Sequence, residues 1–174
     1  PDFQDNFGTS VAVGSGRIVV GAPGWKGQNF VNYFNNAGAA YIFDLKSNEQ
    51  ICKLTVNFGA NVRFGYSVAV GSGRIVVGAP TKDKDSSTLN SGAAFIYDLD
   101  GNLISTLTAG ADEGADYQFG SSVAVGSGRI VVGQPFDSET TTWGGSVYIY
   151  DLDGTLINKI TGNEVQYADL FGFS

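Results

Sequence analysis

The feature that most constrains this chain is a segment that occurs three times almost unchanged. Residues 7–23 read FGTSVAVGSGRIVVGAP, residues 64–80 read FGYSVAVGSGRIVVGAP, and residues 119–135 read FGSSVAVGSGRIVVGQP. A further Phe-Gly pair stands at residues 171–172. Self-similarity of this kind predicts one supersecondary unit that is repeated along the chain and packs on its neighbours.

Each unit reads as four short β-strands. In the first unit, residues 10–13 alternate small residues with valine, and residues 17–20 form an apolar run. Residues 39–45 and 51–55 supply two further strands rich in aromatic and β-branched residues. The Gly-Ser-Gly between the first two strands predicts a tight turn, because glycine adopts positive φ without steric cost. A four-stranded unit at this period is typical of a propeller blade, so we expect an all-β propeller segment. The three expected blades cover about residues 7–56, 64–108 and 119–161, and residues 162–174 begin a further repeat.

The three repeats leave the architecture incomplete. A β-sandwich of twelve strands is the alternative fold, but it does not require near-identical units. A closed propeller has roughly four to eight blades, whereas this chain supplies three. Because the chain has no methionine and stops at Ser174 within a repeat, we expect further blades beyond this segment. The other arrangement is a six-bladed ring made by two copies, since exposed strand edges favour pairing with another chain.

Composition excludes several classes of function. The formal net charge of −7 repels phosphate backbones, so nucleic acid is not an expected partner. No apolar run is long enough for membrane insertion. The chain has no histidine, which excludes Ser-His-Asp and Cys-His arrangements, and its single cysteine, Cys52, excludes an internal disulfide. The glycines lie in hairpins and not before a helix, so no phosphate-binding loop is present. We therefore expect no enzymatic activity, cofactor or metal ion.

These repeats resemble the FG-GAP repeat family, known from the integrin α-subunit propeller and from many bacterial and phage proteins. The Phe-Gly pair, the Gly-Ala-Pro (Gly-Gln-Pro at residues 133–135) and the apolar strands between them recur in order. The short-hairpin form looks most like repeat proteins of marine bacteria and their phages. The resemblance implies a propeller used for adhesion or as part of an extracellular or virion structure. Many family members carry an acidic calcium loop between the first two strands; here that link is Gly-Ser-Gly, without any carboxylate.

The loops that differ between units form the candidate binding surface. Residues 24–37, 81–91 and 136–144 differ in every unit and should lie on the face opposite the identical Gly-Ser-Gly turns. Variable loops on a rigid scaffold are the usual place for binding. Aromatic residues in such loops suit protein contacts or sugar stacking; alternatively, they pack over blade edges or against a neighbouring subunit. The candidate binding or interface residues are Trp25, Phe30, Tyr33, Phe34, Phe136 and Trp143.

One arginine and one aspartate recur in each unit and read as scaffold residues. The arginine begins the second strand, and the aspartate ends the third, so antiparallel pairing should bring them together within a blade. Each such pair should contribute roughly 0.2–1 kcal/mol. The expected pairs are Arg17 with Asp44, Arg74 with Asp98, and Arg129 with Asp151.

Two functional hypotheses from different classes follow from the sequence. The first is a non-enzymatic structural or assembly module of a virion or extracellular appendage, whose partners are other copies or further blades, or other virion or appendage proteins. The second is an adhesion module that binds a host-surface glycan or protein through its aromatic loops. A glycoside hydrolase is a further alternative, since propellers can host two catalytic carboxylates, but the sequence singles out no such pair.

Overall fold

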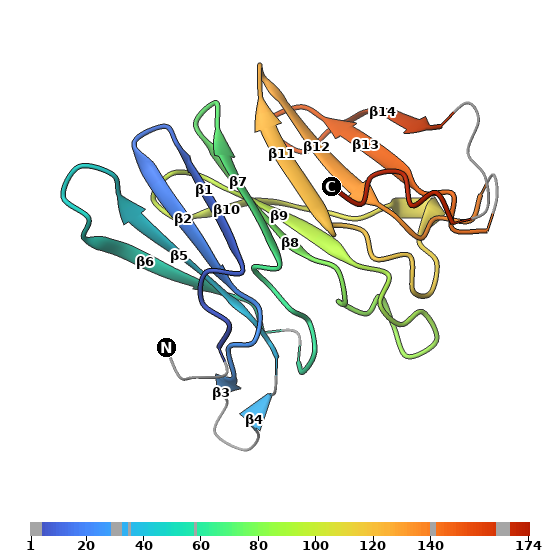
Figure 1. Cartoon of the computed structure of the whole chain (residues 1–174), viewed down its shortest axis with the longest axis horizontal. Helices are drawn as coiled ribbons and strands as arrows, with labels where there is room; N and C mark the ends of the chain where they lie inside the picture. Colours follow the sequence, from blue (N-terminus) through green and yellow to red (C-terminus); the bar gives the residue numbers. More distant parts are fainter. Residues whose placement is uncertain (1–4, 29–32, 35, 58, 140–141, 163–167) are drawn as a thin grey trace.

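The computed structural model describes residues 5–28, 33–34, 36–57, 59–139, 142–162 and 168–174. These residues form three four-stranded antiparallel sheets that stand side by side in an open row (Figure 1). The prediction of an all-β fold with three propeller-type blades is therefore confirmed. Blade 1 contains β1 (Ser10–Gly14), β2 (Arg17–Ala22), β5 (Ala39–Asp44) and β6 (Gln50–Thr55). Blade 2 contains β7 (Ser67–Gly71), β8 (Arg74–Ala79), β9 (Ala93–Tyr97) and β10 (Leu103–Leu107), and blade 3 contains β11 (Ser122–Gly126), β12 (Arg129–Gln134), β13 (Ser146–Tyr150) and β14 (Leu156–Thr161).

The turn that joins the first two strands of each blade has the geometry its sequence predicts. In blade 1, Gly14 pairs with Arg17, which leaves a two-residue loop. Ser15 and Gly16 have φ angles of 48° and 74°. Two successive positive φ angles are the property of a type I′ turn, whose twist matches the flanking strands. The same geometry recurs in blades 2 and 3, so this end of each blade is short and uniform.

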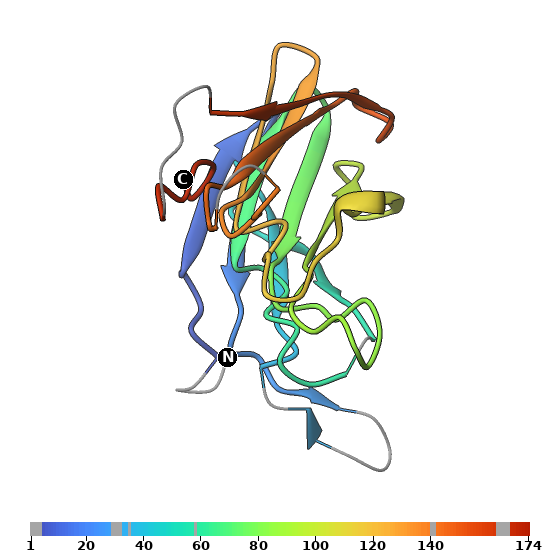
Figure 2. The same ribbon diagram turned by 90° about the vertical axis from the view of Figure 1, so that its right-hand side faces the viewer.

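Three short elements were not foreseen from the sequence pattern. Strands β3 (Gly27–Gln28) and β4 (Tyr33–Phe34) pair with each other beyond the main sheets (Figures 1 and 2). A single 3₁₀ turn, η1, covers Gly110–Asp112. Elements of two or three residues are too short to produce a detectable hydrophobic period. These elements lie in the connecting loops, outside the four-stranded sheets of the blades.

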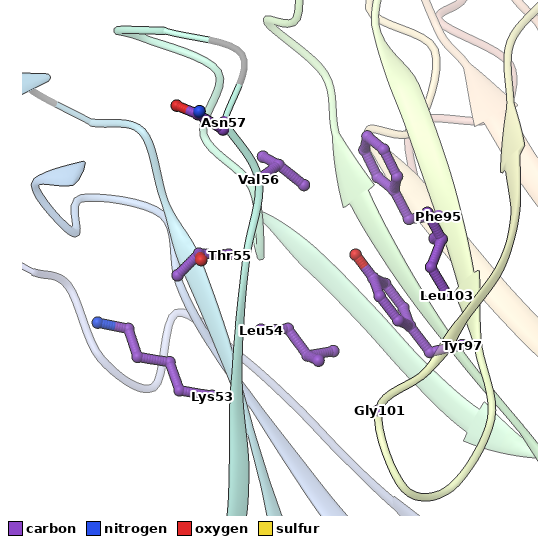
Figure 3. Close-up of a pocket in the computed structure, with 9 residues that line it drawn as sticks. All are labelled: Lys53, Leu54, Thr55, Val56, Asn57, Phe95, Tyr97, Gly101 and Leu103. Atoms are coloured by element: carbon purple, nitrogen blue, oxygen red, sulfur yellow. The ribbon is translucent and has the colours of Figure 1, made fainter. Parts of the chain in front are cut away.

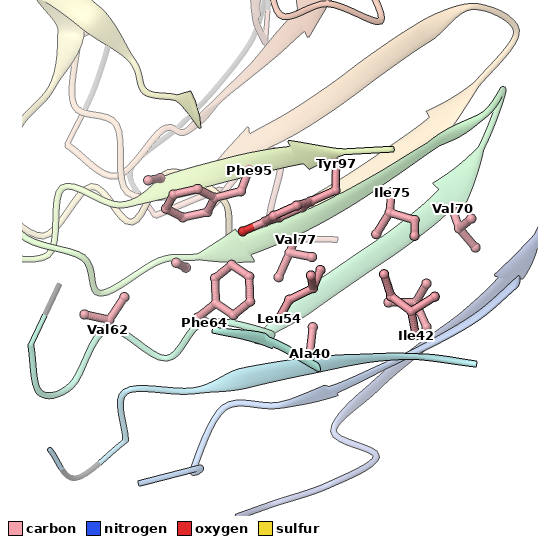
Figure 4. Close-up of a cluster of buried hydrophobic side chains, with 13 residues drawn as sticks. Ala40, Ile42, Leu54, Val62, Phe64, Val70, Ile75, Val77, Phe95 and Tyr97 are labelled. Carbon is pink, nitrogen blue, oxygen red and sulfur yellow. The ribbon is translucent and has the colours of Figure 1, made fainter. Parts of the chain in front are cut away.

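Each pair of neighbouring blades encloses its own hydrophobic core. Between blades 1 and 2, which we call seam 1, Ile42, Leu54 and Phe64 pack with Ile75 and other residues of blade 2 (Figure 4). Between blades 2 and 3, which we call seam 2, Ile96, Leu107, Phe119 and Ile130 form the equivalent cluster. A sheet buried on both faces must be apolar on both, which explains the nearly continuous apolar runs in the second and third strands.

The Phe-Gly motif lies in these seams. Phe64 and Phe119 are fully buried, and their backbones form isolated parallel bridges to Gly38 and Gly92 of the preceding blade. A serine hydroxyl of the preceding blade also donates a hydrogen bond to the carbonyl of the motif glycine at residues 65, 120 and 172. The donor–acceptor distances are 2.9 Å for Ser10 to Gly65, 2.8 Å for Ser67 to Gly120 and 2.8 Å for Ser122 to Gly172. The motif therefore joins one blade to the next.

Candidate functional site

The repeated arginines reach across the seams to the neighbouring blade. Arg17 donates from Nε to the Leu99 carbonyl at 2.9 Å, and its Nη2 lies 3.3 Å from Asp100 Oδ1. Arg74 makes the same pair of contacts one blade later, with the Leu152 carbonyl at 2.9 Å and Asp153 Oδ1 at 2.9 Å. Both acceptors belong to the turn between the third and fourth strands, which we call the outer turn. The arginine therefore connects consecutive blades.

This geometry corrects the partners expected from the sequence. Arg17 Nη1 does lie 3.5 Å from Asp44 Oδ2, which is the pair expected in blade 1. The ion pair of Arg74, however, is with Asp153 of the next blade, and none joins Arg74 to Asp98. Likewise, among the described residues no ion pair joins Arg129 to Asp151; Arg129 donates only to the Gly128 carbonyl, at 2.9 Å. The Arg74 guanidinium extends past its own sheet to the next blade. The carboxylates of Asp98 and Asp151 accept hydrogen bonds from nearer donor groups of their own turns.

Those donors are backbone amides of the outer turns. Asp98 Oδ1 accepts from the N–H of Asp100 at 3.0 Å and of Asn102 at 2.8 Å. Asp151 Oδ1 accepts from Asp153 and Thr155 at 3.0 and 2.8 Å. Such bonds stabilise the ionised carboxylate, so the Asn102 side chain and backbone lower the pKa of Asp98, and the Thr155 amide lowers the pKa of Asp151. The repeated aspartates thus hold the turn that receives the arginine.

Trp25, one of the aromatic candidates, packs over the outer side of blade 1. It lies against a cluster of Ala22, Ala39 and Tyr41. The ammonium of Lys53 stands 3.4 Å from the centre of the Trp25 ring, a cation–π geometry. Most of this ring is therefore engaged by its own blade.

Trp143 and Phe136, the aromatic candidates of blade 3, lie on the loop face. The side chain of Trp143 is 45% exposed, and its ring meets that of Phe136 edge-on with centroids 6.4 Å apart. Phe30 lies outside the described residues. Tyr33 and Phe34 form β4, but their side chains are not described. Among the aromatic candidates whose side chains are described, Trp143 is therefore the exposed one.

A charged cluster that sequence reasoning missed lies at the edge of seam 2. The Lys159 ammonium is 2.9 Å from Asp137 Oδ2 and 3.1 Å from Asp112 Oδ2, and it also pairs with Glu139. Asp112 comes from the connection after blade 2, whereas the other residues belong to blade 3. Burial opposes the charge on Lys159, but the hydrogen bonds to Glu139, Asp137 and the neighbouring groups outweigh it and raise the pKa of Lys159.

Beneath this lysine lies a buried polar pair. The Tyr148 hydroxyl is 3.0 Å from Gln134 Oε1 and 3.3 Å from Asp112 Oδ2. Burial raises the pKa of Tyr148 to about 12, so the phenol stays protonated at neutral pH. Gln134 occupies the position of Ala22 and Ala79, so the change from Gly-Ala-Pro to Gly-Gln-Pro was the available sequence signal. The cluster places one cation among three carboxylates and ties the two blades together.

Two surface pockets lie at seam 1. One has a volume of about 410 Å³ and lies between β6 and β9, where Lys53, Leu54, Tyr97 and Leu103 contribute to its wall (Figure 3). The other, of about 240 Å³, lies on the loop face, and its wall includes Asn36, Arg63 and Tyr66. Neither pocket is lined by a carboxylate, so neither offers the two acids that a glycosidase uses.

The described residues contain no group of three or more His, Cys, Asp or Glu side chains arranged to hold a metal ion. In the described part of the chain, no helix has the length and hydrophobicity needed to span a bilayer.

Comparison with known proteins agrees with the architecture. Among solved structures, the chain is similar to the crystal structure of the computationally designed Ika4 protein, with a TM-score of 0.56 and 14% sequence identity. That likeness covers 95% of this chain and 78% of the designed chain and concerns the fold alone. No curated protein matches the sequence. A family model described as the FG-GAP repeat matches residues 2–43, 53–97 and 102–150. With most of its length matched in three consecutive repeats, the chain belongs to the FG-GAP repeat family.

Proposed function

We propose that this chain is a non-enzymatic structural or assembly module of a virion or an extracellular appendage, which joins its neighbours through the sides of its end blades. The observation that carries the proposal is the contrast between equivalent positions. Leu54 and Leu107 are 6% and 3% exposed in the seams, whereas their equivalent Ile160 in blade 3 is 40% exposed. Apolar positions that are buried at each internal seam are thus open at the end of the row, and exposed apolar patches mark interaction sites.

The opposite end of the row supports the same proposal. Val11 and Val13 of β1 are 67% and 66% exposed, whereas Val70 of β7, which occupies the position of Val13, is 9% exposed because it packs against blade 1. FG-GAP repeats are typical of extracellular proteins, which supports the proposed location. The module then acts through rigid lateral packing, with its variable loops displayed on one face.

The test compares a lateral variant with a loop variant in the native full-length protein. Ile149→Lys places a charge on the open side of blade 3, and Trp143→Ala removes the exposed aromatic side chain from the loop face. Isolated from the native source together with its neighbouring proteins and followed by sedimentation velocity, the first variant should be lost from the assembly and the second should remain in it. An unchanged assembly in the Ile149→Lys protein, with circular dichroism confirming its fold, would contradict the proposal.

The second candidate function is adhesion to a surface glycan or protein. The 45% exposure of Trp143 favours it, since an exposed aromatic side chain on a variable loop suits sugar stacking. A glycan array probed with the wild-type protein and with Trp143→Ala tests this function. Binding that is lost in Trp143→Ala and kept in Ile149→Lys would replace the assembly proposal with the adhesion one.

A further inference from the structure

In both internal seams, the outer turn of the following blade accepts the arginine of the preceding blade. We call this turn the receptor. In seam 1 this turn supplies the Leu99 carbonyl and the Asp100 carboxylate to Arg17. It also contains Gly101, where an added Cβ would stand 2.6 Å from Cys52 Sγ of blade 1. In seam 2 the equivalent Gly154 leaves only 2.6 Å between an added Cβ and Ser105 Oγ. Both receptor turns therefore carry an aspartate followed by a glycine, whose φ angle is 91° at Gly101 and 96° at Gly154.

Blade 3 presents the other half of such a seam. Its arginine, Arg129, is held by the Gly128 carbonyl just as Arg74 is held by the Gly73 carbonyl. No carboxylate among the described residues pairs with Arg129. Around Arg129, apolar side chains whose counterparts in blade 2 are buried are half-buried or exposed. We call this surface the C-terminal face; it comprises Ala124, Arg129, Val131, Val147, Ile149 and Ile160.

Blade 1 carries a different outer turn at the other end of the row. Lys46 stands where blades 2 and 3 have Asp100 and Asp153. The register is secure, because each of these three residues donates its N–H to the aspartate two positions before it, at 2.9, 3.0 and 3.0 Å. The positive-φ position that Gly101 and Gly154 hold in the other turns is taken by Asn48, with a φ angle of 61°. The turn is also one residue longer, since the Asp44 N–H donates to the Glu49 carbonyl, whereas the Asp98 N–H donates to the Asn102 carbonyl.

These differences make the two ends of the row mutually repellent. If the C-terminal face of one copy met blade 1 of another, the Arg129 guanidinium would face the Lys46 ammonium. Like charges placed together are a usual means by which an interface rejects a wrong partner.

We propose that the C-terminal face is a docking surface for a blade of the same repeat type whose outer turn carries Asp-Gly, and that Lys46 prevents a second copy of this chain from being that partner. The inference rests on the proposed lateral assembly and adds its specificity. Arg129 supplies the recognition, because it would donate to a carbonyl and a carboxylate of the incoming turn as Arg17 and Arg74 do. The rejecting turn keeps copies from adding to one another end to end.

The experiment converts blade 1 into an acceptor. In the acceptor variant, residues 46–49 are replaced by Asp-Gly-Asn, the sequence of residues 100–102, and Arg129→Glu disables its own C-terminal face. Mixed with the wild-type chain and followed by sedimentation velocity, it should form a one-to-one complex that associates at least about tenfold more tightly than wild type with itself. The matched control replaces the wild-type chain with the Arg129→Ala chain, which should not bind the acceptor variant.

Two results would overturn the proposal. One is the absence of a complex between the acceptor variant and the wild-type chain when circular dichroism shows both to be folded. The other is end-to-end association of the wild-type chain itself, with cross-links that join Lys46 to the C-terminal face. Should the replaced turn fail to fold, the single exposed substitution Lys46→Asp provides the same test. Failure of the lateral assembly itself would appear separately, as an unchanged assembly in Ile149→Lys.

Discussion

The internal seams and the two outer sides of the row contain the same residues in different environments. Phe64 and Phe119 are fully buried in the seams, whereas Phe7 at one outer side and Phe171 at the other are 45% and 38% exposed. The aromatic contact within the blade does not differ, since Phe7 meets Tyr41 at 5.2 Å and Phe119 meets Tyr148 at 5.3 Å. The aromatic contact within a blade is therefore the same at each position in the row. The exposure of the motif phenylalanine depends on whether a neighbouring blade covers it.

The largest difference between seam and outer side should come from the motif phenylalanines. Phe119→Ala removes a fully buried ring from seam 2 and should lower the free energy of unfolding by about 3–5 kcal/mol. Phe7→Ala removes an exposed ring with one aromatic contact and should cost about 1 kcal/mol. Urea denaturation of both variants measures the difference. Equal losses would mean that burial in the seam does not govern the role of the motif.

Lysines at one strand position provide the next test. Lys159→Met leaves Asp137, whose side chain is 2% exposed, without its cation, and should destabilise the protein by about 3 kcal/mol. Lys53→Met at the outer side of blade 1 loses a cation–π contact with Trp25 and should cost about 1 kcal/mol. Thermal unfolding at constant pH compares them. A Lys159→Met protein as stable as Lys53→Met would show that the cluster does not hold seam 2.

Equivalent glycines test the close approach of the inner strands. An added Cβ at Gly71 would stand 2.7 Å from the Val125 carbonyl oxygen of the next blade, whereas at Gly126 it would meet nothing within 4 Å. Gly71→Ala should therefore cost about 1–3 kcal/mol, and Gly126→Ala should change stability by less than about 0.5 kcal/mol. Denaturant midpoints of the two variants settle the matter. Tolerance of Gly71→Ala would indicate that the inner strands can separate.

The arginines should give a smaller effect of the same kind. Arg74→Ala removes contacts to the Leu152 carbonyl and the Asp153 carboxylate in a partly exposed site, so we expect a loss of about 1 kcal/mol. Arg129→Ala has no such contacts to lose and should be nearly neutral. A double-mutant cycle of Arg74 with Asp153 isolates the pair. A coupling of zero would contradict the view of this arginine as a connector between blades.

The acid response should be the weakest test and should not distinguish seam from outer side. Hydrogen bonds from the Ser87 hydroxyl and amide lower the pKa of Asp85 to about 2. The Asn102 side chain and backbone lower the pKa of Asp98, and the Thr155 amide lowers the pKa of Asp151. A lowered folded-state pKa stabilises the protein above the unfolded-state pKa, and this contribution disappears as pH falls through the folded-state value. Carboxyl NMR should therefore report Asp85 titrating near pH 2, and Ser87→Ala should raise its pKa. An ordinary pKa for Asp85 in the wild-type protein would contradict the hydrogen bonds that Ser87 donates to its carboxylate.

How much the sequence could predict depended on the range of the interactions. Strand positions and the Ser15-Gly16 turn follow from alternation and positive φ, which act within a few residues, so these predictions could be made directly. The partner of Arg74 could not be predicted from antiparallel pairing alone. Its guanidinium chooses between Asp98 in its own blade and Asp153 in the next, and that choice depends on how the sheets are placed.

The blade, its repetition and the family could be read from the residues, because these depend on local periodicity and turn chemistry that are copied three times. The packing of the blades sets which blade each arginine contacts, which motif phenylalanine is buried, and that Lys159 contacts both Asp112 and Asp137. The physical reason is that such contacts depend on the packing of whole sheets against each other. The identical motif is therefore a seam residue at Phe119 and a surface residue at Phe7.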